Sequence, residues 1–157
     1  MTVERHTTRT LLLLGVAALA FSLAQTTLVP AFPELEHGLH TDTSGVAWTL
    51  TGYLVAAAVF TPIMGRLGDM FGKRRLLVVS IVFFTLGSVV AAVTADLWVV
   101  VAGRAIMGIG GGIFPLCFGI IRDEFPRERV ARSVGLLSAV VGIGGGLGLI
   151  LGGVLVD

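Results

Sequence analysis

Hydrophobic residues run along this chain in long blocks that charged residues separate cleanly. The blocks do not alternate between apolar and polar positions, as the roughly ten-residue strands of a membrane barrel would. A helix needs about 20 apolar residues to cross the hydrocarbon core of a bilayer, and each block reaches that length. The pattern predicts an all-α, polytopic membrane helix bundle with five transmembrane helices. The predicted spans are residues 10–33, 43–65, 76–95, 97–121 and 133–156.

The composition supports a protein whose solvent is lipid. Of 157 residues, 55% are hydrophobic and 13% are charged. A soluble domain of this length has too little interior to hide so much apolar surface, so a lipid bilayer is the expected partner. The net charge of +1 gives no reason to expect a nucleic-acid partner. The single cysteine, Cys117, allows no internal disulfide and is predicted to be a small packing residue.

Lysine and arginine gather on one side of the predicted spans. If the spans alternate in direction, all but Arg104 of the eleven basic residues lie on the side of the amino terminus. The positive-inside rule then predicts a cell-membrane protein with a cytoplasmic amino terminus. The basic residues on this side are Arg5, Arg9, Arg66, Lys73, Arg74, Arg75, Arg122, Arg127, Arg129 and Arg132, and the other side carries the acids Glu34, Glu36, Asp42, Asp96 and Asp157.

A cleaved signal peptide is the competing interpretation of the first span, because a basic start precedes its apolar run. That run continues to Pro33, well beyond the usual 7–15 residues, so a membrane span is favoured. An enzyme is not expected, because His6, His37 and His40 lie in predicted tails and loops without clustered carboxylates or a nucleophile. No cofactor and no metal site are predicted.

Two features stand out inside the spans. Glycines four residues apart, such as Gly108/Gly112, share a helix face in the fourth span and recur in the fifth. Such faces either pack tightly or form flexing seams, and both interpretations stay open. Arg104 lies about 10 Å into the fourth span, where a charge is costly and is expected to face the protein interior. Its candidate neighbours are Gln25, Thr26, Thr27 and backbone carbonyls.

The segment between the second and third spans, GRLGDMFGKRR, carries a family resemblance. It resembles the signature loop of the major facilitator superfamily, and it lies on the cytoplasmic side as that family requires. Met70 departs from the pattern at a position where arginine is common. The matching residues are Gly65, Leu67, Asp69, Gly72, Lys73, Arg74 and Arg75.

Two further motifs extend the resemblance over nearly the whole chain. Arg104, Gly108 and Gly110 are similar to an arginine-and-glycine motif of the fourth span, with Met107 in place of a glutamine. The fifth span is similar to a motif of proton-coupled exporters, with Leu149 in place of its proline. Its matching residues are Gly135, Gly144, Gly148, Gly152 and Gly153. Near the end of the first span, Gln25 stands where drug exporters usually have an aspartate.

The resemblance implies a secondary active transporter that exports drugs or small metabolites and is coupled to protons. Five spans would be an incomplete six-helix half, so a truncated amino-terminal portion is expected, with the missing carboxy-terminal half and a small-molecule substrate as partners. Leu149 and Gln25 leave solute uptake open as an alternative. A non-transporting membrane scaffold or sensor is the third possibility.

The resemblance also implies a role for the segment Gly65–Arg75 as a conformational latch. Asp69 places a negative charge near a helix end, where it can favour the positive amino-terminal end of a neighbouring helix. The basic residues Lys73, Arg74 and Arg75 can bind anionic lipid. Gly72, together with Gly65 and Gly68, is expected to permit a tight connection.

Overall fold

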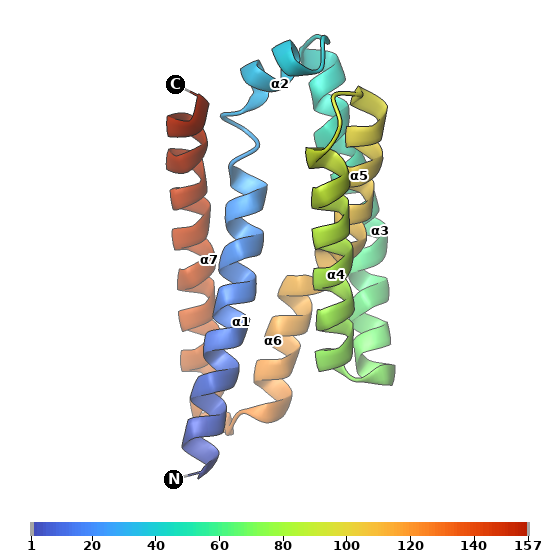
Figure 1. Cartoon of the computed structure of the whole chain (residues 1–157). Coiled ribbons are helices and arrows are strands. Elements are labelled where there is room, and N and C mark those ends of the chain that lie inside the picture. The colour runs from blue at the N-terminus through green and yellow to red at the C-terminus, as the bar shows by residue number, and fades with distance from the viewer. Residues whose placement is uncertain (1, 157) are drawn as a thin grey trace. The chain divides into compact units, whose positions relative to one another are not determined.

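The computed structural model describes residues 2–156, with side chains from residue 7 to residue 154 (Figure 1). Helices account for every regular element in this range, so the prediction of an all-α fold is confirmed. Arg5, His6 and Asp157 lie outside the described side chains. The side of the membrane assigned to each charged residue stays a prediction. The elements are α1 (Thr2–Thr26), α2 (Phe32–Gly38), α3 (Thr43–Phe71), α4 (Lys73–Ala92), α5 (Leu97–Ile109), the 3-10 turn η1 (Gly110–Gly112), α6 (Ile113–Glu124) and α7 (Arg127–Val156).

Five helical segments of the described chain are long and apolar enough to cross a membrane, as predicted. Large apolar side chains stay exposed along them; Leu13 is 72% exposed and Val154 is 70% exposed. Exposure of so many large apolar side chains is unfavourable in water and favourable in lipid, so these helices are suited to a bilayer. The segments are Thr7–Thr26, Thr43–Phe71, Lys73–Ala92, Leu97–Glu124 and Arg127–Val154.

The ends of the helices follow local chemistry. Asp42 and Asp96 cap α3 and α5: the Asp42 carboxylate accepts a hydrogen bond from the Gly45 amide at 2.9 Å, and Asp96 accepts from the Trp98 amide at 2.9 Å. α1 ends at Thr26, ahead of Pro30 and Pro33. In a continued helix the Pro30 ring would collide with the Thr26 carbonyl, so the chain turns there. It resumes in the short α2, where Pro33 lies in the first turn, a position that tolerates proline.

The fourth span is interrupted, whereas the fifth is not. Both contain three consecutive glycines, yet η1 replaces the α-helix at Gly110–Gly112 while α7 continues unbroken through its own glycines. Pro115, in the first turn of α6, lacks an amide hydrogen, and its ring would collide with the carbonyl of Gly111 in a continuous helix. The fifth span has Leu149 instead of a motif proline, and its helix runs on.

The described chain divides into two compact units, each considered by itself. The first unit contains residues up to Pro30 and from Cys117 onward, and the second contains Ala31–Leu116. In the first unit α1 and α7 run parallel and side by side (Figure 1), and the Ser22 hydroxyl on α1 donates to the Val141 carbonyl on α7 at 2.8 Å. In the second unit α5 packs against both α3 and α4. These two packings position the residues of the candidate site.

Candidate functional site

The connection between α3 and α4 is a single residue, Gly72. Its φ of +98° is a backbone conformation that side chains with a Cβ atom rarely adopt, so glycine is required for this turn. Gly68, one turn earlier, is buried, and a Cβ atom there would lie 2.6 Å from Leu116 Cδ2. Gly65 has open space around it. The three glycines of the segment therefore differ in role, and Gly72 alone makes the turn.

Asp69 reaches across this turn to the first residue of α4. Its Oδ1 atom lies 2.6 Å from Lys73 Nζ, with 66% of the Asp69 side chain and 22% of the Lys73 side chain exposed. An ion pair so open to solvent contributes about 0–1 kcal/mol, because water and salt screen it. The pair is weak enough to be exchanged for another partner. Arg74 and Arg75 lie on the exposed side of α4.

Arg104 lies in the middle of α5, half-buried against α3. Tyr53 on α3 is close enough to interact with it electrostatically. Its Nε atom is buried and has no hydrogen-bond partner among the described residues. A buried donor without a partner costs about 1–3 kcal/mol, which is a reason to look for a ligand or a change of conformation that satisfies it.

Two of the polar residues predicted near Arg104, Thr26 and Thr27, donate hydrogen bonds to backbone carbonyls of α1. The Thr26 hydroxyl donates to the Ser22 carbonyl at 3.0 Å, and the Thr27 hydroxyl donates to the Leu23 carbonyl at 2.9 Å. Both residues belong to the first unit, whereas Arg104 belongs to the second, so their proximity to Arg104, like that of Gln25, stays a prediction. Within its own unit Arg104 has Tyr53 as a neighbour that the sequence did not suggest.

Ser80 is a second polar residue that sequence patterns missed. It is fully buried on α4, and its hydroxyl has no partner within the described chain. Its backbone carbonyl lies against Gly110 in η1. A lone serine in an apolar span gives no pattern to recognise, so only the packing identifies Ser80 as a polar group beside the interrupted part of the fourth span.

The glycines of the fourth span form the close contacts of the second unit. A Cβ atom at Gly108 would lie 2.6 Å from the Tyr53 carbonyl oxygen, and one at Gly112 would lie 2.6 Å from Met64 Cβ, both on α3. Gly110 faces the opposite neighbour, α4, at Phe84 and Ser80. The helices around η1 approach too closely for any side chain larger than hydrogen.

In the fifth span the predicted motif divides between two environments. A Cβ atom at Gly144 would lie 3.0 Å from Ser22 Cβ, and one at Gly148 would lie 2.9 Å from the Leu23 carbonyl oxygen, so both contact α1. Gly152 likewise lies against Thr27 and Pro30. Gly135 and Gly153 have no neighbour within 4 Å of such an atom. The motif therefore contributes two glycines in contact with α1, one in contact with the segment that follows α1, and two open positions.

Metal chemistry has no visible basis in the described part of the chain. No group of three or more histidine, cysteine or acidic residues lies together there. Cys117 is a buried free thiol, as its predicted packing role requires. The remaining candidates are the α3–α4 turn with Asp69, and Arg104 inside the membrane-spanning region.

Comparison with known proteins agrees with the resemblance drawn from the motifs. The chain matches the Major Facilitator Superfamily over residues 14–157. An MFS-type transporter of Aspergillus terreus is 40% identical over 84% of the chain, and multidrug resistance protein 3 of Bacillus subtilis is 38% identical over 71%. The tetracenomycin C resistance and export protein of Streptomyces glaucescens is 32% identical over 94%.

The chain spans 24%, 22% and 28% of the lengths of these three relatives. The match to the family nevertheless extends over almost all of its own length and includes the α3–α4 turn, the fourth span and the fifth span. Helix content, five membrane-crossing segments and this match agree. The chain belongs to the Major Facilitator Superfamily of multi-pass membrane transporters.

Proposed function

We propose that this chain is the amino-terminal part of a secondary active transporter that exports drugs or small metabolites in exchange for protons. The observation that carries the proposal is the one-residue α3–α4 turn with its Asp69–Lys73 ion pair, in a family of transporters. Export is supported by two relatives whose names state multidrug resistance, or resistance and export. Since the chain spans about a quarter of such relatives, the remaining carboxy-terminal part would form the transport pathway with it.

Export and uptake are separated by an accumulation assay on the protein expressed from its complete reading frame. Cells that carry an exporter accumulate less of a fluorescent drug than control cells, and cells that carry an importer accumulate more. Gln25, which replaces a carboxylate, keeps uptake as the second candidate. Proton coupling predicts that collapsing the pH gradient removes the difference; a difference that survives the collapse would contradict it. No effect on any tested solute would favour a scaffold or sensor.

The proposed orientation places the amino terminus and the α3–α4 turn in the cytoplasm. The support is the gathering of basic residues at the α3–α4 and α6–α7 connections. The test replaces Cys117 and any further cysteines by serine and then introduces Ala95→Cys or Glu128→Cys. A membrane-impermeant maleimide applied to intact cells should label the first variant and should label the second only after lysis. The reverse pattern would overturn the orientation.

We infer that Asp69 acts as a conformational latch. Its ion pair with Lys73 is exposed and weak, so the carboxylate can change partner during transport at low cost. A latch that biases two conformations by about 1 kcal/mol changes their ratio about fivefold, and Asp69→Asn should reduce transport by about that factor. The matched control is Glu128→Gln, an exposed acid in the first turn of α7. Unchanged transport by Asp69→Asn at normal membrane expression would refute the latch.

Arg104 is proposed to be an interior charge that contacts substrate or stabilises one conformation. Support comes from its buried Nε atom, which has no partner in the described residues, and from Tyr53 nearby. Arg104→Ala should impair transport more than Arg104→Lys, because lysine retains the positive charge but not the planar donor group. Transport by both variants at the wild-type rate would reduce Arg104 to a tolerated charge.

A further inference from the structure

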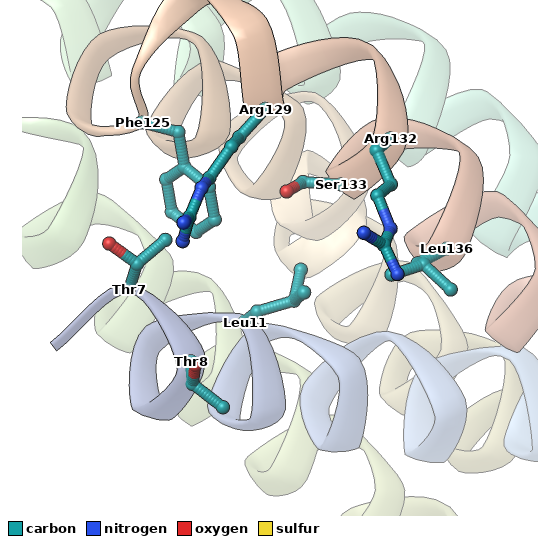
Figure 2. A pocket seen from close by; sticks show the side chains of 8 residues that line it. All are labelled: Thr7, Thr8, Leu11, Phe125, Arg129, Arg132, Ser133 and Leu136. Atoms are coloured by element: carbon teal, nitrogen blue, oxygen red, sulfur yellow. The ribbon is translucent and has the colours of Figure 1, made fainter. Parts of the chain in front are cut away.

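A cavity of about 300 Å³ lies in the first unit, where α1 and α7 begin. Residues 7–11 of α1 and 129–136 of the parallel α7 form its walls, and Phe125, just before α7, closes one side (Figure 2). All of its described lining residues belong to the first unit, whereas the α3–α4 turn and Arg104 belong to the second. The roles proposed for Asp69 and Arg104 therefore do not involve this cavity.

Among the residues whose side chains the structure describes, the lining of the cavity is basic and includes no acid. Arg129 and Arg132 line it, together with the hydroxyl residues Thr7, Thr8 and Ser133. Figure 2 shows both arginine side chains extending from α7 towards α1. The acids of the neighbouring connection are absent from the lining. Two guanidinium groups side by side make a site for an anion that accepts several hydrogen bonds, as phosphate does.

The two arginines differ in their interactions with the rest of the protein. Arg129 takes part in an interaction within the protein. Arg132 is exposed and makes neither a hydrogen bond nor an ion pair with any residue whose side chain the structure describes. Arg132 is therefore the main binding group, and Arg129 adds positive charge beside it.

The lining of the cavity also includes apolar side chains. Leu11 lies one turn after Thr7 on α1, and Leu136 lies one turn after Arg132 on α7, where it is 49% exposed. Arg9 and Arg132 are the last charged residues before the apolar runs of the first and fifth spans, so the composition places the cavity near the boundary between headgroups and hydrocarbon. Two arginines with apolar side chains one turn further into the spans match an amphiphile better than a free ion.

We propose that this cavity binds the phosphate of an anionic phospholipid headgroup, with Arg132 as the principal contact and Leu11 and Leu136 against the start of the lipid chains. Assigning the lipid to the cytoplasmic leaflet rests on the orientation proposed above, but the binding itself does not. Basic pockets between membrane helices are suited to such headgroups, and a single basic residue near the surface adds enough attraction to change the affinity about fivefold.

The test measures lipid binding to the protein expressed from its complete reading frame and purified in detergent. Native mass spectrometry gives dissociation constants for phosphatidylglycerol and for zwitterionic phosphatidylcholine. Arg132→Ala should weaken phosphatidylglycerol binding about fivefold, and Arg129→Ala/Arg132→Ala should weaken it further. The matched control is Arg127→Ala, an exposed arginine of the same connection that does not line the cavity, and it should bind as the wild type does.

Each other outcome refutes the proposal in a recognisable way. Equal phosphatidylglycerol affinity of Arg132→Ala and Arg127→Ala would show that the cavity is not the site. Equal affinity of the wild type for phosphatidylcholine would remove the role of charge. Competition by soluble glycerol 3-phosphate as effective as that of the lipid would assign the cavity to a free phosphate ester instead. None of these results depends on transport, so the lipid site can fail while the transporter proposal stands.

Discussion

Replacing single glycines by alanine separates the glycines that hold helices together from those that do not. Gly108 and Gly142 each begin a pair of glycines four residues apart, so the sequence treats them alike. In the structure a Cβ atom at Gly108 would lie 2.6 Å from the Tyr53 carbonyl oxygen and 2.9 Å from the Ala57 amide nitrogen. At Gly142 such an atom would have no neighbour within 4 Å.

The expected difference follows from this geometry. Non-bonded heavy atoms prefer about 3.5–4.0 Å, so Gly108→Ala requires α3 and α5 to separate by about 1 Å. The neighbours are backbone atoms and cannot rotate away. Overpacking of this kind costs about 1–3 kcal/mol. The gain in helix preference from glycine to alanine is the same at both positions, so it cancels in the comparison. Gly108→Ala should therefore be about 1–3 kcal/mol less stable than Gly142→Ala.

The assay is reversible unfolding of the 157-residue chain in mixed micelles of rising sodium dodecyl sulfate content. Helix content from circular dichroism and tryptophan fluorescence give the free energy of unfolding, because Trp48 and Trp98 pack against each other at 6.4 Å between α3 and α5. If Gly108→Ala were as stable as Gly142→Ala, the close contact between α3 and α5 would be refuted. Equal stabilisation of both variants would show that only the higher helix preference of alanine acts at the two positions.

Three further changes test the turn, a cap and the continuity of the fifth span in the same assay. Gly72→Ala should cost about 1–2 kcal/mol because of the positive φ, and a wild-type stability would contradict the turn. Asp96→Ala should cost about 1 kcal/mol by removing the acceptor for the Trp98 amide, whereas Asp96→Asn should retain most of the stability. Leu149→Pro should cost about 3 kcal/mol or more by breaking a continuous α7, and a smaller loss than for Gly72→Ala would argue against that continuity.

Much of the architecture could be predicted because lipid imposes strict rules on a chain. Apolar blocks of sufficient length must be helices, since every backbone group needs a partner inside the bilayer. The all-α fold and five spans followed from this rule, and the motif around Asp69 led to the family. Gly72 was expected to allow a tight connection, and the connection is one residue long.

The candidate site was less accessible to prediction. Arg104 was recognised from its charge alone, but Tyr53 and the buried Ser80 carry no pattern in sequence, because one hydroxyl in an apolar helix is common. The cavity beside Arg132 was also missed. In the sequence its arginines indicate only which side of the membrane the connection lies on. The parallel packing of α1 and α7 brings them opposite Thr7 and Thr8.

The order of apolar blocks along the chain determined by itself that this protein is a helical membrane protein, and the motif around Asp69 led to its family. Those properties depend on the length and hydropathy of segments and on the spacing of nearby residues, all of which can be read from the sequence. Tertiary structure decided which of several equivalent glycines pack, where the fourth span is interrupted, and which basic residue lines a cavity. The reason is that each depends on the distance to another helix: Gly108 meets α3 and Gly142 meets no described atom within 4 Å, although their local sequences look the same.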